Sequence, residues 1–387
     1  MNRIYMDNAA TTRITEPVLE AMMPYLTDVF GNPSSVHAFG REARKPLEQA
    51  RKQVADALGA QPNEIYFTGC GTESDNWAIR GAAYASAKKG KHIITSQIEH
   101  HAVLHTVEQL EKEGFTATYL PVDEFGLVNP DDLEKAIQPD TILITIMMAN
   151  NEIGTIQPIE QLAQIAKDHK ILFHTDAVQA IGSVKIDVKA MNIDLLSLSG
   201  HKFHAPKGVG ALYIRQGVKL QRLIYGGAQE RTQRGGTENM ASIIGMGKAI
   251  ELADQQMEQH NQKLCAMRDR MIEGIMESIP ETRLNGHATK RLPGNVNVSI
   301  RYIEGEGILI GMDLEGIAAS SGSACTSGSL DPSHVLLAIG LTHEIAHGSL
   351  RLTLSEDNTM EDVEIAIAAL TRVVTRLRSM SPLYNAN

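Results

Sequence analysis

Short apolar runs alternate with segments of helical spacing through the first two thirds of the chain. The runs are residues 64–68, 91–95, 117–121, 141–148, 171–174, 193–198 and 210–214. Between them, segments such as 40–58 place their apolar residues three and four positions apart. This alternation is typical of a doubly wound, mostly parallel sheet with helices on both faces. We therefore expect an α/β fold built on a seven-stranded sheet.

The pattern changes in the last third of the chain. Residues 242–279 form one long helical pattern that is charged on one face and has few breakers. Two short strand patterns and a final amphipathic helix follow, at residues 295–300, 350–353 and 360–378. We predict a large domain at 14–257 and a smaller α+β domain at 258–387, to which residues 1–13 return.

The composition is that of an ordinary globular protein and excludes several functional classes. The 387 residues are 43% hydrophobic and 21% charged, which suits two domains. A formal net charge of −10 argues against a nucleic-acid scaffold. The three cysteines form no CxxC pair, so we expect no zinc knuckle or disulfide framework. With no membrane-length apolar run and no signal or transit segment, we predict a cytoplasmic protein that contacts neither membranes nor nucleic acid.

Two neighbouring strand patterns end in an acid and an amine. Asp176 follows the run 171–174, and Lys202 follows the run 193–198. Ligands of parallel α/β sheets bind outside the carboxyl ends of the strands. No Gly-rich nucleotide fingerprint lies nearby. An acid and a lysine there suit pyridoxal phosphate, whose aldehyde forms a Schiff base with a lysine and whose ring nitrogen stays protonated beside a carboxylate.

Other polar residues at strand ends have both a functional and a structural interpretation. Gly71 and Thr72 open a helix after a strand, where free N–H groups suit a phosphate, but the motif also fits a glycine turn with Thr72 as N-cap. His100 could stack on an aromatic cofactor and shuttle protons, or lie on the surface. Asn151 could bind a cofactor oxygen, or the Asn150–Asn151 pair could form an Asx turn. Asp176 itself could cap a helix.

A run of small residues, Ser320 to Gly328, surrounds Cys325. Such a run predicts an exposed, mobile loop, where a cysteine suits a nucleophile or a sulfur carrier better than a core. The alternative is a flexible linker with an incidental thiol. Arg351, in a strand-like run, could clamp a carboxylate through two parallel hydrogen bonds or form a structural ion pair.

The segment His343 to His347 matches the HExxH pattern of zinc hydrolases. In those enzymes the two histidines lie on successive turns of one helix, and a third ligand follows. Here Gly348 and a strand-like run come directly afterwards, without that extension. We predict no metal site.

Together these motifs resemble the cysteine desulfurases of the NifS/IscS type, a family of fold-type-I pyridoxal-phosphate enzymes with a class-V aminotransferase-like sequence. The similarity runs nearly end to end. It covers residues 5–12, 31–35, 72–74, 99–100, 149–152, 174–179, 199–202, 234–239, 320–327 and Arg351.

The resemblance implies a role for each candidate residue. The catalytic residues are Lys202, which holds the cofactor, His100, which stacks on its ring, and Cys325, which accepts sulfur. The implied cofactor-binding residues are Asp176 at the ring nitrogen, Asn151 and Gln179 beside the ring, Gly71, Thr72, Ser199 and His201 at the phosphate, and Thr237 at the phosphate of the other subunit. Asn8 and Arg351 hold the substrate carboxylate.

The resemblance also implies a reaction and its partners. L-Cysteine is converted to L-alanine, and its sulfur passes to Cys325 as a persulfide. An iron–sulfur scaffold or another sulfur-acceptor protein then takes it for cluster or thiocofactor synthesis. A homodimer is implied, because Thr237 serves the neighbouring site. The alternatives are a selenocysteine lyase, another pyridoxal-phosphate lyase or aminotransferase of this fold, or a module that mainly hands on sulfur.

Overall fold

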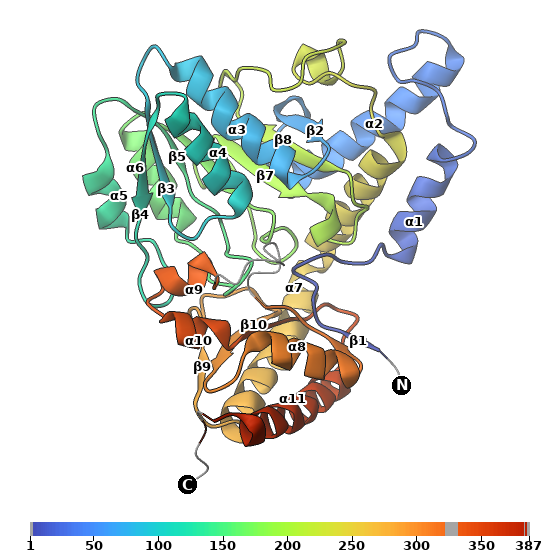
Figure 1. Ribbon diagram of the computed structural model, residues 1–387. Coiled ribbons are helices and arrows are strands. Elements are labelled where there is room, and N and C mark those ends of the chain that lie inside the picture. The colour runs from blue at the N-terminus through green and yellow to red at the C-terminus, as the bar shows by residue number, and fades with distance from the viewer. Residues whose placement is uncertain (1–2, 322–331, 383, 385–387) are drawn as a thin grey trace.

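The larger part of the molecule is built on one seven-stranded sheet (Figure 1). The computed structural model describes residues 3–321, 332–382 and 384. In spatial order the strands are β2 (Ile65–Thr68), β8 (Gly210–Ile214), β7 (Leu195–Ser199), β6 (Leu172–Asp176), β5 (Thr141–Thr145), β3 (His92–Ser96) and β4 (Thr116–Leu120). All neighbours are parallel except β8, which is antiparallel to both β2 and β7. The predicted α/β fold is confirmed.

Helices cover both faces of this sheet, and successive strand residues point to opposite faces. The helices are α1 (Glu16–Met22), α2 (Ala38–Ala57), α3 (Gly71–Ser86), α4 (His101–Lys112), α5 (Pro130–Ala136) and α6 (Ile159–Asp168). On β3, Ile93 packs in a cluster with α3 and α4, whereas Ile94 packs in the cluster that contains α2, α5 and α6. Because both faces of the sheet are covered, its strands carry buried apolar residues on both faces.

The C-terminal part has a core of its own. It contains α8 (Gly305–Leu314), α9 (His334–Ala338), α10 (His343–His347), α11 (Met360–Met380) and an antiparallel sheet of β9 (Thr282–Leu284), β10 (Asn295–Ile300) and β12 (Ser349–Thr353). The long helix α7 (Met240–Ser278) runs from one part into the other (Figure 1). Met246 belongs to the large-sheet core and Met271 to the second core. The predicted domain boundary at 257/258 falls inside α7 and stays a prediction.

The N-terminal residues return to this C-terminal part. Strand β1 (Ile4–Tyr5) pairs in parallel with β11 (Ile317–Ala318), and Asp7 bridges to Thr353 on β12. Met6 is fully buried in the second core. The chain then continues toward α1 in the large part (Figure 1), so residues 7–15 connect the two cores.

Several element ends differ from the sequence-based prediction. Asp176 is the last residue of β6 and does not lie beyond it. Strand β5 ends at Thr145, before the predicted Met148, although Met148 still donates its N–H to the Asp176 carbonyl at 2.8 Å. None of the helices in the described part of the chain is long and apolar enough to cross a membrane.

Candidate active site

The predicted acid and lysine lie at the ends of adjacent strands. Strands β6 and β7 are parallel, with Asp176 paired to Ser197. After Ser199 the chain forms a short 3₁₀ turn, Gly200–Lys202. Lys202 is the last residue of this turn, which directly follows the strand paired with β6. The structure therefore brings Lys202 and Asp176 together, as the strand pattern predicted.

The Asp176 carboxyl is buried at 5% exposure. Burial raises its pKa above the ordinary value, while a hydrogen bond from the Val178 N–H (2.9 Å) and the charge of Lys202 act in the opposite direction. Asp75 on α3 is a second buried carboxyl, and burial followed by the negative charge of Asp176 raises its pKa. A protonated ring nitrogen would supply the cation that a carboxylate in this position requires.

The N-terminal segment 8–12 contacts the lysine. The Lys202 ammonium donates to the carbonyl oxygens of Ala9 and of Ala10, the latter at 2.9 Å. Gln179 Nε2 donates to the Ala9 carbonyl at 3.0 Å, and the Thr12 N–H and hydroxyl both donate to the His201 carbonyl. Ala9 and Ala10 were missed as candidates, because a backbone carbonyl leaves no signal in the sequence.

The same edge of the sheet offers donors for a phosphate, at the end of β7 and at the start of α3. Helix α3 begins at Gly71, where an added Cβ would lie 2.8 Å from Val178 Cγ2 and 3.2 Å from Ser199 Cβ, so only glycine fits there without displacing a neighbour. Ser199 Oγ is buried and has no hydrogen-bond partner among the described residues. Thr72 follows in the first turn of α3, whose N–H groups are available to an anion. The donors at this strand end, together with Lys202 and Asp176, fit pyridoxal phosphate.

His100 is held as a neutral imidazole. It is the N-cap of α4, and its Nδ1 accepts the Ala102 N–H at 3.1 Å. Burial lowers its pKa to about 4, and the positive charge of Lys202 and the neighbouring histidines add to this effect. Since Nδ1 is an acceptor, the single proton of the neutral ring belongs on Nε2. A neutral ring with a transferable proton suits the predicted role of His100.

Glu99 is a buried acid to which the sequence had assigned no role. Its carboxyl accepts the Ser96 hydroxyl at 2.5 Å and the Met147 N–H at 2.9 and 3.0 Å. It therefore joins the ends of β3 and β5 directly before His100. Burial raises its pKa to about 8. The signal in the sequence was its position after a strand.

Replacing Glu99 with glutamine is expected to flatten the pH dependence of stability. Folded Glu99 keeps its proton up to a pH of about 8, whereas the unfolded residue loses it near 4.5. Between these values the folded state binds more protons, so stability falls as pH rises, by at most about 1.4 kcal/mol per pH unit. Denaturant unfolding of E99Q at pH 5.5, 6.5 and 7.5 should show a smaller fall. E108Q, at an exposed position on α4, is the control. If the free energy of unfolding fell equally with pH in E99Q and in the native protein, the assignment would be contradicted.

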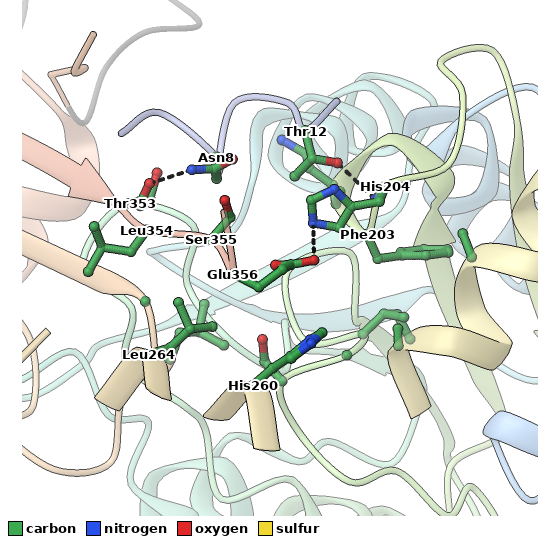
Figure 2. Close-up of a pocket in the computed structure, with 18 of the residues that line it drawn as sticks. Asn8, Thr12, Phe203, His204, His260, Leu264, Thr353, Leu354, Ser355 and Glu356 are labelled. Carbon is green, nitrogen blue, oxygen red and sulfur yellow. Dashed lines mark hydrogen bonds and ion pairs between the residues drawn. The ribbon is translucent and has the colours of Figure 1, made fainter. Parts of the chain in front are cut away.

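Arg351 lies beside Asn151 and the N-terminal segment. Its Nη1 donates to the Asn151 carbonyl at 3.0 Å, and its Nη2 donates to Asp7 Oδ1 at 2.9 Å. Its Nε is buried and has no partner in the described part of the chain. Asn8 Nδ2 donates to the Thr353 carbonyl at 2.8 Å (Figure 2). Asn150 forms an Asx turn, with Oδ1 accepting the N–H groups two and three residues on.

A cavity of about 320 Å³ adjoins this segment, and its lining includes Asn8, Gln179 and Lys202. Figure 2 shows its other wall, where His204 and Glu356 form an ion pair of 2.9 Å. Asp176, His100 and Ser199 do not line it. The cavity therefore shares Lys202 and Gln179 with the predicted cofactor site and extends from there toward His204 and Glu356.

Among the candidate residues that the structure describes, Thr237 lies apart from the others within this single chain. It is exposed, in the segment before α7. Nearby, Arg234 pairs with Glu73 in the first turn of α3, with Nε 2.8 Å from Oε1, and Glu230 forms a buried pair with Arg51 at 2.7 Å. The first pair holds the segment close to the start of α3, and the second ties it to α2. The implied contact with a second subunit stays a prediction.

Cys325 lies outside the described residues, but both ends of its segment are anchored at the site. Ser320 forms an antiparallel bridge with Arg351, with N···O distances of 2.6 and 3.1 Å. On the other side, the Ser333 hydroxyl donates to the buried Glu152 carboxyl, and His334 Nε2 contacts the Glu99 carbonyl at 2.9 Å. In the described ranges, no group of three His, Cys, Asp or Glu side chains is placed to hold a metal ion.

Comparison with known proteins is consistent with this geometry. The profile of the family described as Aminotransferase class-V matches residues 4–365. "Cysteine desulfurase IscS" of Methanosarcina thermophila is 61% identical over 380 residues, covering 98% of this chain and 94% of the relative. The solved structure of a "NifS-like protein" has a TM-score of 0.92 at 39% identity, covering 97% of this chain and all of that one. A structure titled "SspA in complex with cysteine" has a TM-score of 0.82 at 40% identity, covering 91% and 99%.

Proposed function

The chain belongs to the class-V aminotransferase family and acts as a pyridoxal-phosphate-dependent cysteine desulfurase, and from this premise we propose that it transfers the sulfur of L-cysteine to Cys325 and then to an acceptor protein. The observation that carries the proposal is the position of Asp176 at the end of β6 and of Lys202 in the turn that follows the adjacent parallel strand β7. The unpaired Ser199 hydroxyl and the start of α3 lie at the same edge of the sheet.

When bound, pyridoxal phosphate supplies an aldehyde for a Schiff base and a ring that withdraws electrons from the substrate Cα. Lys202 holds the cofactor through its amine and moves the proton at Cα. Asp176 holds the proton of the ring nitrogen, and neutral His100 covers the ring and assists proton transfer. Gln179 and Asn151 lie beside the ring.

The remaining cofactor residues hold the phosphate, and a separate pair holds the substrate. Ser199, His201, Gly71 and Thr72 donate hydrogen bonds to the phosphate, with Thr237 contributed by the second subunit of a homodimer. Arg351 binds the substrate carboxylate, with Asn8 beside it. The buried, unpartnered Nε of Arg351 supports this assignment, because a carboxylate would satisfy it.

The Cys325 side chain reacts as a thiolate and receives the substrate sulfur. Its sulfur bonds to the substrate sulfur while the C–S bond breaks, and the electron pair of that bond stays with the substrate carbon. Protonation of that carbon yields L-alanine, and Cys325 carries a persulfide. The anchoring of Ser320 at Arg351 and of Ser333 at Glu152 supports this role, because it holds both ends of the Cys325 segment at the site. An iron–sulfur scaffold or other carrier in the cytoplasm then takes the sulfur.

The test is spectroscopic and analytical. Purified protein reconstituted with pyridoxal phosphate should absorb visible light, change its spectrum on addition of L-cysteine, and form one L-alanine per sulfur released to a reductant. The same assay with L-selenocysteine examines the alternative lyase. Formation of pyruvate and ammonia in place of alanine, or no spectral change, would contradict the proposal.

A further inference from the structure

The proposed carboxylate-binding arginine already has an acidic partner within its own chain. Arg351 Nη2 lies 2.9 Å from Asp7 Oδ1. The arginine side chain is only 3% exposed, whereas that of Asp7 is 21% exposed. A guanidinium has five N–H donors. With one donated to Asp7 and one to the Asn151 carbonyl, the buried Nε still has no partner among the described residues.

Asp7 is fixed in this position by its backbone. Met6 N donates to the Ala318 carbonyl at 2.9 Å, and the Thr353 N–H donates to the Met6 carbonyl at 2.7 Å. On the other side, Ala9 N donates to Thr353 Oγ1 at 2.9 Å. The Tyr5 hydroxyl donates to the Asp7 carbonyl at 3.0 Å. With the backbone held on both sides, the carboxylate stays beside Arg351.

We propose that Asp7 is a positioning residue that keeps the hold of Arg351 on carboxylates weak enough for the product to leave. This inference rests on the proposed role of Arg351. A carboxylate bound at the free donors of Arg351 shares one guanidinium with Asp7 and is repelled by its charge. Without Asp7 the buried guanidinium loses its hydrogen-bonded acidic partner, so it attracts an incoming anion more strongly. Both effects make Asp7 oppose anion binding.

The chemistry of the reaction explains why such opposition is useful. L-Cysteine and L-alanine share the same carboxylate and amine, so a tight carboxylate clamp binds substrate and product equally. Uniform binding of this kind lowers KM without accelerating the chemical step, and it slows release of the product. Because the Asp7 carboxylate competes for Arg351, the arginine still orients the carboxylate of the substrate but binds it less tightly.

The test is Asp7→Asn, which keeps an oxygen acceptor at Oδ1 and removes the charge. The probes are 3-mercaptopropionate, which lacks the amine of cysteine, and its neutral amide, 3-mercaptopropionamide. Both are measured by calorimetry on the cofactor-loaded protein and as competitors of L-cysteine. D7N is expected to bind the acid about five- to thirtyfold more tightly and the amide unchanged. The difference should shrink at 1 M salt, because the Asp7 side chain is partly exposed.

The steady-state constants should change in a matched way. In D7N the KM for L-cysteine and the inhibition constant for L-alanine both fall, and kcat falls where product release limits it. A purely structural ion pair would lower the melting temperature of D7N and leave the affinity for the acid unchanged, which would overturn the proposal. Weaker binding of the acid by D7N would overturn it as well. Asp7→Ser gives the same readout if D7N does not fold.

Two further variants separate this inference from the proposed function. Asp254→Asn removes a charge from a surface ion pair with Lys185 (2.8 Å) and should leave all constants unchanged, which controls for net charge. Arg351→Gln should abolish the preference for the acid over the amide. If R351Q keeps that preference, the proposed role of Arg351 fails. If R351Q loses it but D7N does not tighten binding, the role of Asp7 alone fails.

Discussion

Replacing Lys202 with alanine is expected to lower the turnover of L-cysteine by at least about a thousandfold, because the amine has two roles. In the proposed mechanism it holds the cofactor, and it moves the proton at the substrate Cα. The structure places it in the turn that follows β7, where its ammonium donates to the carbonyls of Ala9 and Ala10. L-Alanine formation measures the loss, and the visible absorbance of the cofactor should shift in the same preparation.

Lys207→Ala is the matched control, because Lys207 is an exposed lysine in the same connection. It should retain turnover within about twofold, as surface substitutions usually do. Small primary amines should partly restore turnover to K202A, since they replace the missing base. Turnover of K202A within tenfold of the native rate would exclude Lys202 as the residue that holds the cofactor.

Replacing Cys325 with alanine should lower desulfuration at least about a hundredfold while leaving the cofactor spectrum close to native. The thiolate is the only group on this chain to which we assign the substrate sulfur. Since Lys202 and Asp176 are intact, the spectral response to L-cysteine should persist without release of sulfur. Detection of sulfide with a reductant and of persulfide by mass spectrometry measures the loss.

The control is Cys265→Ala, a partly exposed free cysteine on α7. It should keep the native rate of desulfuration. A native rate for C325A with reductant present would show that another group accepts the sulfur. The two active-site variants therefore differ in their spectra: K202A alters the cofactor signal, and C325A preserves it.

The class of fold and the central pair of the site follow from the order of the amino acids alone. A strand covered on both faces is mostly apolar on both, so the strands of the sheet can be recognised as short apolar runs. Polar residues replace apolar ones toward the carboxyl ends of these strands, and this change of pattern is enough to place Asp176 and Lys202 near neighbouring strand ends. Strand ends were less accurate: Asp176 lies inside β6, because backbone pairing with β7 continues up to it.

The groups that surround that pair, in contrast, are set by tertiary packing. The carbonyls of Ala9 and Ala10 reach Lys202 across about half the chain, and Asp7 reaches Arg351 from the other end of the sequence. Such contacts depend on how the N-terminal segment packs between two cores. Local periodicity reports on neighbours along a helix or strand, and it carries no signal for pairs that the fold brings together from distant segments.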